Sequence, residues 1–202
     1  MIEQLKAMTP LRAQLIDWVS EVGDSARVRC ALVGGSVRDV VLGASVGDFD
    51  FVVEGNTKTF AQTLVRHHGG RIHVHPAFGT VTWTTDVGAV DFAMARTETY
   101  REPGALPDVT PAVLEEDLRR RDFSVNAMAL IVSAAGKGTL LDPFDGLGDL
   151  KQRSLRVLHP ASFVDDPTRA WRAARYEGRL GLHWTNETVQ AWIHAQSVQA
   201  PY

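Results

Sequence analysis

Two carboxylates separated by a single residue are the first feature of this sequence that could do chemistry. Asp48 and Asp50 occupy positions i and i+2 of a predicted strand, so both side chains project from one face, about 7 Å apart at the backbone. Asp91 lies between Val90 and Phe92 on another predicted strand, where an unpaired charge would be costly. Oxygen-only ligands suit Mg²⁺, which also takes contacts from substrate phosphates. The three aspartates could build a two-metal site, although an isolated Asp-x-Asp pair also occurs as simple solvation of a strand end.

A glycine turn lies shortly before this acidic pair. Gly34 and Gly35 precede a short helical pattern, and backbone N–H groups exposed at a helix start can bind phosphate oxygens. Arg38 would lie about one turn into that helix, within reach of the same phosphates. The spacings of a Walker loop and of a dinucleotide fingerprint are both absent. The turn predicts phosphate binding, with a bare turn and a surface arginine as the alternative.

Other residues with metal-binding or nucleophilic chemistry lack partners in the sequence. His73 and His75 share the face of a predicted strand, but no third ligand follows at the spacing of a zinc site. Cys30 is the single cysteine and lies in an apolar run, which predicts a buried thiol without a disulfide. Neither feature is expected to carry the main activity.

A scaffold of strands and helices must bring the acidic pair and the glycine turn together. Apolar alternation and short apolar runs predict strands at 28–33, 48–53, 71–75, 80–85 and 89–95. Asp86, Val87 and Gly88 predict a hairpin between the last two of them. Helical periodicity predicts helices at 9–23, 37–42 and 57–68, the first of which starts at Thr9-Pro10 and stops at Gly23.

The second half of the chain is predicted to be mostly helical. Residues 97–112 contain three prolines and lack apolar periodicity, which predicts a loop with a functional role. A helical pattern follows around residues 119–132, then a short strand at 140–141 and a turn-rich stretch at 142–148. From residue 163 onward the pattern is almost entirely helical, and Thr185-Asn186 is a predicted cap for a last helix at 187–196.

Charge is distributed unevenly along this chain of 202 residues, whose net charge is −3. Residues 119–179 carry eleven Lys and Arg against seven Asp and Glu. Such asymmetry suits a site where arginines bind a polyphosphate and carboxylates elsewhere bind cations, and scattered surface charge would also produce it. No apolar stretch is long enough for a membrane span, and the first ten residues lack the pattern of a signal peptide. We therefore expect a cytoplasmic protein.

Four segments in order along the chain resemble the motifs of the class II tRNA nucleotidyltransferases, or CCA-adding enzymes, and of the related bacterial poly(A) polymerases. They are LVGGSVRD (32–39) with LG (42–43) and GDFDFVV (47–53), RRRDFSVNAMA (119–129), DPFDGLGDL (142–150), and DDPTR (165–169) with Arg172 and Arg175. Each fragment alone is short, but the four together span most of the chain at compatible spacing. Asp165 stands where the family usually has Glu, so a side-chain contact made from there would be one methylene shorter.

The resemblance implies a role for each matching residue. Asp48 and Asp50 would bind two Mg²⁺ ions, and Asp91 would be the third carboxylate and would activate the 3′-hydroxyl through its metal. The incoming triphosphate would be bound by Gly35, Arg38 and Arg121. Asp166 and Arg169 would select the base, with Arg172 and Arg175 of the same helix supporting the nucleotide.

The resemblance also implies the fold and its division. We expect an α+β head with a polymerase β-like nucleotidyltransferase fold, a mixed sheet with flanking helices, over residues 1–158. Residues 159–202 would begin an all-α neck that carries the nucleotide-selecting motif. Members of the family have further helical regions that dock tRNA. The sequence is compatible both with a shorter form of the enzyme and with a part of a longer enzyme.

The implied activity is addition of CMP and AMP from CTP and ATP to the tRNA 3′ end without a template. The four motifs do not distinguish CCA addition from CC-only or A-only addition, or from poly(A) synthesis. An inactive module that binds RNA or nucleotides is the alternative outside the enzymes. Three clustered carboxylates argue against it, because they would repel phosphate and bring a pure binder no benefit. The sequence leaves the oligomeric state open.

Overall fold

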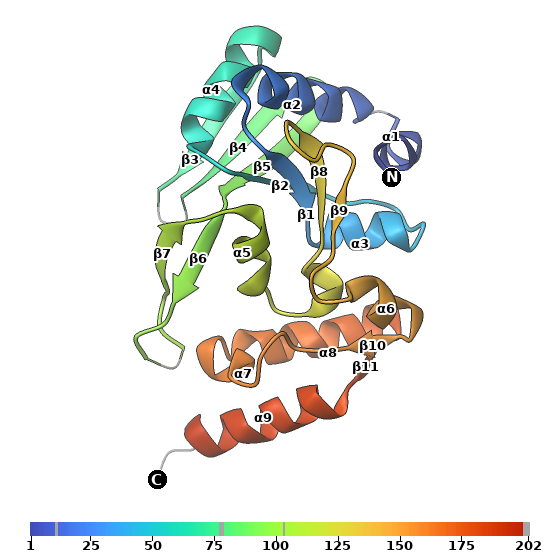
Figure 1. Cartoon of the computed structure of the whole chain (residues 1–202), viewed down its shortest axis with the longest axis vertical. Coiled ribbons are helices and arrows are strands. Elements are labelled where there is room, and N and C mark those ends of the chain that lie inside the picture. Colours follow the sequence, from blue (N-terminus) through green and yellow to red (C-terminus); the bar gives the residue numbers. More distant parts are fainter. Residues whose placement is uncertain (11, 77–78, 103, 200–202) are drawn as a thin grey trace.

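The computed structural model describes residues 1–10, 12–76, 79–102 and 104–199, and is centred on a mixed sheet of seven strands (Figure 1). In spatial order these are β3 (Arg71–His75), β4 (Thr80–Thr85), β5 (Gly88–Met94), β2 (Phe49–Val53), β1 (Cys30–Val33), β8 (Ala129–Ser133) and β9 (Leu140–Leu141). Strands β2 and β5 are parallel, and all the other neighbours are antiparallel. The predicted hairpin joins β4 to β5, with Thr85 opposite Gly88. The prediction of an α+β fold with a mixed sheet is confirmed.

Helices surround this sheet and continue beyond it. They are α1 (Ile2–Met8), α2 (Ala13–Ala26), α3 (Gly35–Val41), α4 (Thr57–His68), α5 (Leu114–Arg119), α6 (Gly146–Lys151), α7 (Ser162–Asp165), α8 (Thr168–Leu180) and α9 (Asn186–Gln199), with a 3₁₀ turn at Ser124–Asn126. Two small sheets pair β6 (Arg96–Thr99) with β7 (Asp108–Pro111), and β10 (Ser154–Leu155) with β11 (His183–Trp184).

Strand alternation gives the central sheet two different faces. Phe51 of β2 and Phe92 of β5 stack with ring centroids 5.7 Å apart, inside the large core that also contains buried residues of α2 and α4. Asp50 and Asp91 are their chain neighbours and therefore point to the opposite face. On that opposite face, α5 packs Leu114 against a smaller apolar cluster from β1, β2 and β8. Charged side chains thus lie on the face that helices cover only in part.

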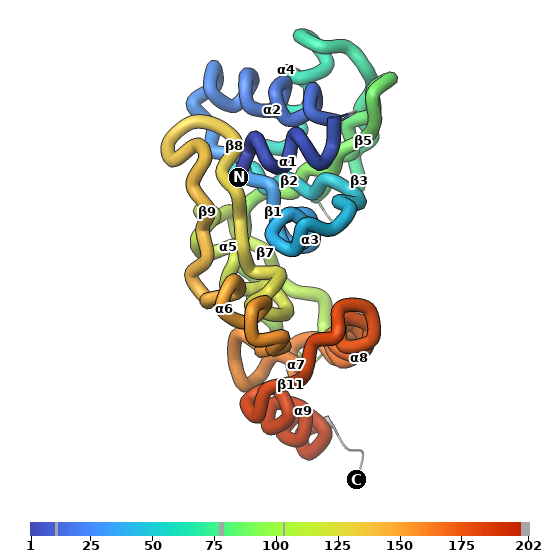
Figure 2. Tube along the Cα trace, turned by 90° about the vertical axis from the view of Figure 1, so that its right-hand side faces the viewer, coloured from blue at the N-terminus to red at the C-terminus, as the bar shows by residue number. Residues whose placement is uncertain are grey.

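The last three helices lie at the end of the molecule opposite α2 and α4 (Figures 1 and 2). Phe163 of α7 stacks on Trp184 of β11 and packs edge-on against Trp192 of α9. Phe123, which follows α5, contacts the ring of Tyr176 on α8. Aromatic packing therefore joins these helices to each other and to the segment that follows α5. None of the described helices is long and apolar enough to cross a membrane, and placement in the cytoplasm stays a prediction.

The prediction of a loop at 97–112 was wrong where β6 and β7 pair as a hairpin, and correct for the described residues 100–102 and 104–107 between the two strands. Thr97 pairs with Thr110, and Thr99 pairs with Asp108. All four residues of β7 are exposed, so no apolar alternation marks this strand in the sequence. Polar contacts hold the hairpin: the hydroxyls of Thr97 and Thr110 lie 3.2 Å apart across the two strands, and Glu98 of β6 accepts a hydrogen bond from Arg120, which follows α5. Residue 103 lies outside the described residues.

The prediction of a helix at 119–132 was also wrong. Helix α5 ends at Arg119, a 3₁₀ turn follows at Ser124–Asn126, and β8 begins at Ala129. All five residues of β8 are buried, because α2 packs on one face of the strand and α5 covers part of the other. A strand buried on both faces has a continuous apolar sequence, and short apolar runs do not separate strand from helix.

The first predicted helix has different ends from those expected. Helix α2 begins at Ala13 instead of Thr9, runs through Gly23 and ends at Ala26, where Arg27 adopts a left-handed conformation with φ 54°. Helix α1 was not predicted. Gly23 therefore does not end the helix. Its small size is required for packing, because a Cβ at this position would overlap the buried Ser133 side chain. The Ser133 hydroxyl donates to the carbonyl of Val28 and accepts from the N–H of Cys30, so it cannot move without losing both bonds.

We therefore expect Gly23→Ala to destabilise the protein by about 1–3 kcal/mol, although alanine favours helix more than glycine does. Gly178 of α8 is the matched control, because a Cβ there meets nothing within 4 Å. Gly178→Ala is expected to stabilise by up to about 1 kcal/mol. Urea unfolding of the three proteins measures both changes, and equal midpoints for the two variants would contradict the packing role of Gly23.

Candidate active site

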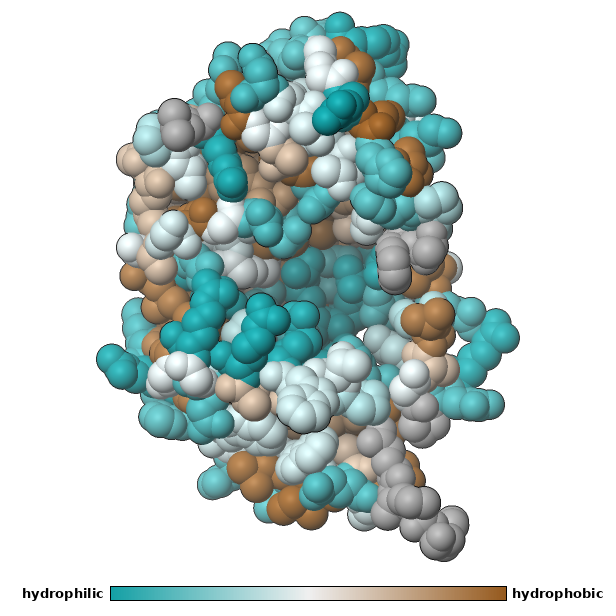
Figure 3. Space-filling view, turned by 180° about the vertical axis from the view of Figure 1, so that it is seen from behind, coloured by the Kyte–Doolittle hydropathy of each residue, from teal (hydrophilic) through white to brown (hydrophobic). Residues whose placement is uncertain are grey.

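The partly covered face of the sheet opens into a cleft of about 730 Å³ between the strands and α8. Figure 3 shows a hollow lined by hydrophilic residues across the middle of one side of the molecule. Ten site residues were predicted from sequence, and nine of them line this cleft: Gly35, Arg38, Asp48, Asp50, Arg121, Asp166, Arg169, Arg172 and Arg175. Asp91 lines an adjoining groove of about 560 Å³, and Asp50, Arg120 and Arg121 line both spaces. The structure thus brings the predicted residues into two connected spaces.

The three carboxylates meet where β2 and β5 run side by side. Asp50 and Asp91 are directly opposite each other in the parallel ladder, and Asp48 immediately precedes β2. Burial raises the pKa of Asp50, and the charges of Asp91 and Asp48 raise it further, while the Arg121 charge lowers it. Like charges at this spacing repel, so a cation or a proton would relieve the repulsion.

These carboxylates offer oxygen ligands only, the donors that Mg²⁺ prefers. Among the described residues, no group of three or more His, Cys, Asp or Glu side chains is arranged to hold a metal ion. Mg²⁺ often takes only one or two protein carboxylates and completes its coordination with substrate phosphates and water. The donor set at Asp48, Asp50 and Asp91 therefore fits Mg²⁺ in its chemistry.

The glycine turn connects β1 to α3 and holds the start of the acidic segment. Gly34 has φ 66°, a conformation that L side chains rarely adopt. The Ser36 hydroxyl donates to the carbonyl of Asp48 at 2.6 Å. Gly35 faces Arg38, whose Nη2 would lie 3.4 Å from a Cβ at that position. The turn and Asp48 are thereby fixed to one another.

Arg38 is buried in the cleft wall, with 2% of its surface exposed. It donates to the carboxylate of Asp39 and to Oδ1 of Asn126, and its guanidinium lies 5.3 Å from the ring centroid of Tyr176. The second carboxylate oxygen of Asp39 lies 3.4 Å from Nη2 of Arg179. Arg38 therefore has a strong partner already, and its positive charge is largely balanced by Asp39.

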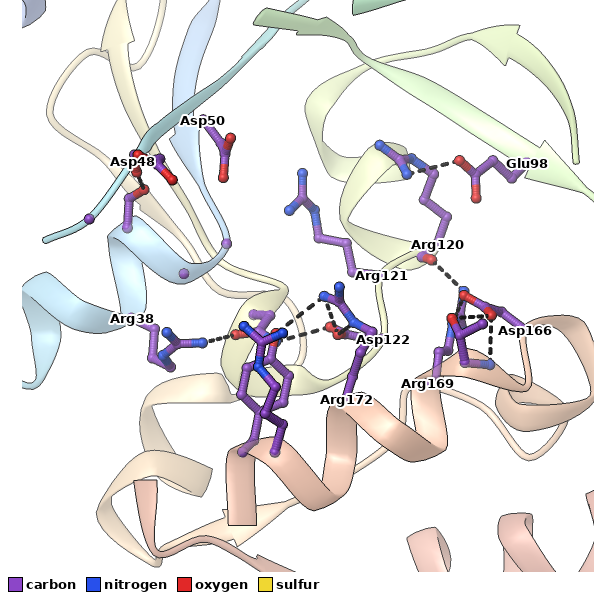
Figure 4. Close-up of a pocket in the computed structure, with 18 of the residues that line it drawn as sticks. Arg38, Asp48, Asp50, Glu98, Arg120, Arg121, Asp122, Asp166, Arg169 and Arg172 are labelled. Atoms are coloured by element: carbon purple, nitrogen blue, oxygen red, sulfur yellow. Dashed lines mark hydrogen bonds and ion pairs between the residues drawn. The ribbon is translucent and has the colours of Figure 1, made fainter. Parts of the chain in front are cut away.

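The side chain of Arg121 extends from the segment after α5 toward Asp50 (Figure 4). Its Nη2 donates to the buried carboxylate of Asp117 at 2.9 Å, and its Nη1 would be 3.2 Å from a Cβ at Gly34. The Nε atom of Arg121 is buried and makes no hydrogen bond to the described residues. Arg121 thus has one nitrogen anchored on Asp117, and its charge lowers the pKa of the nearby Asp50 carboxyl.

Asp166 and Arg169 meet at the start of α8. Arg169 is buried and donates to the Ser162 hydroxyl at 2.7 Å and to the carbonyl of Arg120 at 3.0 Å. Oδ1 of Asp166 accepts from the backbone N–H of Thr168 at 2.9 Å. The remaining pair of atoms, Nε of Arg169 and Oδ2 of Asp166, are 3.8 Å apart. The two residues thus support the helix and still face each other.

The other arginines of α8 differ in their contacts. Arg172 donates from Nε to Asp122 at 2.7 Å, and its guanidinium lies 5.8 Å from the ring of Tyr176. Asp122 also accepts from its neighbour Phe123 and from Asn126. Arg175 lines the cleft. Beside α8, Asp165 lies 3.7 Å from His159, whose pKa is lowered because burial outweighs the attraction of Asp165.

Several residues of the cleft were missed by the sequence interpretation. Asp122 and Asn126 belong to the RRRDFSVNAMA segment, where an acid that follows three arginines was a usable signal. Tyr176 lies one turn after Arg172, on the same face of α8. Glu98 and Tyr100 lie in the segment interpreted as a loop, and nothing in the sequence marked them. Burial and Glu98 raise the pKa of Tyr100 to about 12, so its hydroxyl stays protonated.

A mixed sheet with carboxylates on two adjacent parallel strands, beside a glycine turn and a set of arginines, places the protein in the polymerase β-like nucleotidyltransferase class. Residues 30–156 match the poly A polymerase head domain family. The chain belongs to that family.

Individual proteins agree with this assignment. The chain is 51% identical over 161 residues to the A-adding tRNA nucleotidyltransferase of Aquifex aeolicus, covering 80% of this chain and 20% of that protein. It is 43% identical over 173 residues to the CC-adding tRNA nucleotidyltransferase of Deinococcus radiodurans, covering 85% of this chain and 46% of that protein. A solved structure of a CCA-adding enzyme in an apo form superposes with a TM-score of 0.90 at 38% identity, covering 98% of this chain and 47% of that chain. The chain therefore spans less than half the length of each of these proteins.

The raised pKa of Asp50 gives a prediction for the protein in EDTA. Because the folded pKa lies above that of the unfolded chain, ionisation of Asp50 costs folding free energy at neutral pH. Asp50→Asn should therefore raise Tm at pH 7, by no more than about 2 °C, because Asp50 is an exposed residue of β2 and solvent screens its charge. The gain should disappear as the pH falls through the folded pKa towards about pH 3, where the wild-type carboxyl is protonated. Asp86→Asn in the exposed β4–β5 turn is the control, and an unchanged or lower Tm for Asp50→Asn at pH 7 would contradict the repulsion.

Proposed function

We propose that this protein adds CMP and AMP from CTP and ATP to the 3′ end of tRNA without a template. The observation that carries the proposal is the pairing of Asp50 with Asp91 at the junction of the cleft and the groove. Family membership and the names of the similar proteins support it. Those names include A addition and CC addition as well as CCA addition, so the set of bases added is part of the proposal.

The two spaces divide naturally between two substrates. The larger cleft contains the glycine turn, Arg121 and the arginines of α8, which suit a nucleoside triphosphate. The groove contains Asp91 and only two arginines, Arg120 and Arg121, and would receive the RNA end. Because Asp50 and Arg121 line both spaces, the α-phosphorus and the attacking 3′-oxygen would meet beside them.

Asp48, Asp50 and Asp91 would hold two Mg²⁺ ions. Ions bound there lower the pKa of the attacking hydroxyl and neutralise charge that develops on the α-phosphate and the pyrophosphate. Arg121 would add fixed positive charge on the triphosphate side, while Arg38 would orient the glycine turn from the cleft wall. The remaining rate acceleration would come from positioning both substrates in line for displacement. No nucleophilic side chain takes part in this mechanism.

Base selection would use the facing atoms of Asp166 and Arg169. Cytosine and adenine each present an amino donor beside a ring-nitrogen acceptor, whereas uracil and guanine present a carbonyl acceptor beside an N–H donor. A carboxylate oxygen next to a guanidinium N–H matches the first pattern only. Oδ2 of Asp166 and Nε of Arg169 are the atoms left for this role by the contacts to Thr168, Ser162 and Arg120. Arg172 and Arg175 would support the nucleotide from the same helix.

A boundary near residue 158 would separate a catalytic head from the beginning of a helical neck. The family match ends at residue 156, and helices α7, α8 and α9 follow it. The neck would then supply the base-selecting residues from outside the head. The triphosphate would be bound between the two parts, with its phosphates on the head and its base on the neck.

Incubation with tRNA lacking its 3′ end, with each labelled nucleoside triphosphate in turn, tests the proposed activity and identifies the bases added. Asp48→Ala and Asp50→Ala should abolish addition in Mg²⁺ and leave the fold intact, because both changes remove metal ligands and relieve repulsion. Asp86→Ala, in the exposed β4–β5 turn, is the control. Activity of either site variant within about tenfold of wild type would rule out the two-metal assignment.

Asp166→Ala tests the base-selecting pair. A lost or mismatched polar contact in a desolvated site costs on the order of 1–3 kcal/mol, so use of CTP and ATP should fall roughly tenfold to a hundredfold and their advantage over UTP and GTP should narrow. Glu177→Ala changes an exposed acid of the same helix away from the cleft and should have no effect. The measurement is single-nucleotide addition with all four triphosphates. If Asp166→Ala keeps the wild-type preference, selection comes from other residues of the cleft.

A further inference from the structure

A row of polar residues crosses four strands of the central sheet and ends at the acidic pair. In the strand register, His73 of β3 lies opposite Thr82 of β4, Thr82 opposite Asp91 of β5, and Asp91 opposite Asp50 of β2. Residues directly opposite one another in a ladder project from the same face. His73, Thr82 and Asp91 therefore share the face that carries the carboxylates of the site. The row extends the site to the β3 edge of the sheet.

Hydrogen bonds link this row to a second histidine. The Thr82 hydroxyl donates to Oδ1 of Asp91. The same hydroxyl lies 3.0 Å from Nε2 of His75, and because its single proton goes to Asp91, it accepts the His75 bond. The ring of His75 packs edge-on against that of His73, with centroids 4.5 Å apart. A chain from His75 through Thr82 to Asp91 results.

We propose that Thr82, oriented by His75, is a positioning residue that fixes the carboxylate of Asp91 for the transfer reaction. This inference rests on the proposed function. Threonine is stiff at χ1, and β4 is an inner strand bonded on both sides by β3 and β5. One oxygen of Asp91 is thereby held against the sheet, and the other is left for a metal ion on the groove side.

The hydrogen bond from Thr82 to Asp91 is better suited to orienting the Asp91 carboxylate than to stabilising the fold. Thr82 is only partly buried and Asp91 is exposed in the groove, so water can replace the hydrogen bonds of either residue. Loss of the Thr82 hydroxyl should therefore leave the fold unaffected, since valine favours strands. It would free the Asp91 side chain to rotate, and a carboxylate with several rotamers binds a metal less well.

The experiment compares Thr82→Val with Thr82→Ser and Thr84→Val. Thr84 lies two residues along β4 on the same face, and it lines neither the cleft nor the groove. Thr82→Val should lower kcat about tenfold, the size of a lost hydrogen bond to a charged group, with KM for the triphosphate unchanged within about twofold. Thr82→Ser keeps the hydroxyl and should recover most of the rate, and Thr84→Val should match wild type.

A second measurement does not depend on transfer. Calorimetric titration with Mn²⁺ should show about tenfold weaker binding for Thr82→Val and no change for Thr84→Val. His75→Phe, which keeps a ring but removes the N–H donor, should give a smaller loss in the same direction. Equal Mn²⁺ titrations, or equal kcat values, for the two valine variants would overturn the positioning role. A wild-type protein that binds Mn²⁺ but transfers no nucleotide would instead refute the proposed function and leave the Mn²⁺ comparison valid.

Discussion

The arrangement of the site depends on one fully buried carboxylate, that of Asp117 on α5. It accepts hydrogen bonds from the backbone N–H of Arg96 and from the side chains of Arg120 and Arg121. A buried charge is tolerated only when it is paired and hydrogen-bonded, so these partners are held in fixed positions. Arg121 then faces Asp50, and the carbonyl of Arg120 receives Arg169. Asp117 thereby fixes the positions of the β6–β7 hairpin, the acidic pair and α8 relative to one another.

The same requirement for pairing explains why a cleft rich in arginine belongs to a chain with a negative net charge. Arg38 is paired with Asp39, Arg172 with Asp122, and Arg120 with Glu98 and Asp117. Each pair keeps a guanidinium in place before any substrate arrives, which would lower the entropy cost of binding the proposed triphosphate. Seven arginines and six acids line the cleft, so most of its positive charge is balanced by carboxylates of the cleft itself.

Because side chains alternate between the two faces of the sheet, the residues that pack the core lie on one face and the carboxylates of the site lie on the other. On β2 and β5, one set of side chains forms the aromatic core that also includes residues of α2 and α4, and the other set carries the carboxylates. Parallel pairing of these two strands places Asp50 opposite Asp91, although 41 positions separate them in the sequence. Helix α5 covers only part of the second face, and the cleft and the groove occupy space beside it.

Local patterns in the sequence determined the strands of the central sheet except β8, the glycine turn and the helices after residue 162, and the family motifs indicated ten of the residues that line the cleft and the groove. These features follow from short-range rules of alternation, periodicity and turn formation. They also follow from motifs whose residues lie close together along the chain. Tertiary structure decided the β6–β7 hairpin, the strand at Ala129–Ser133 and the passage of α2 through Gly23. It also decided which arginines are neutralised by acids and which atoms stay available. Each of these outcomes depends on a distant partner, such as Glu98 with Arg120 or Gly23 with Ser133, and contacts between residues far apart leave no periodic signal in the sequence.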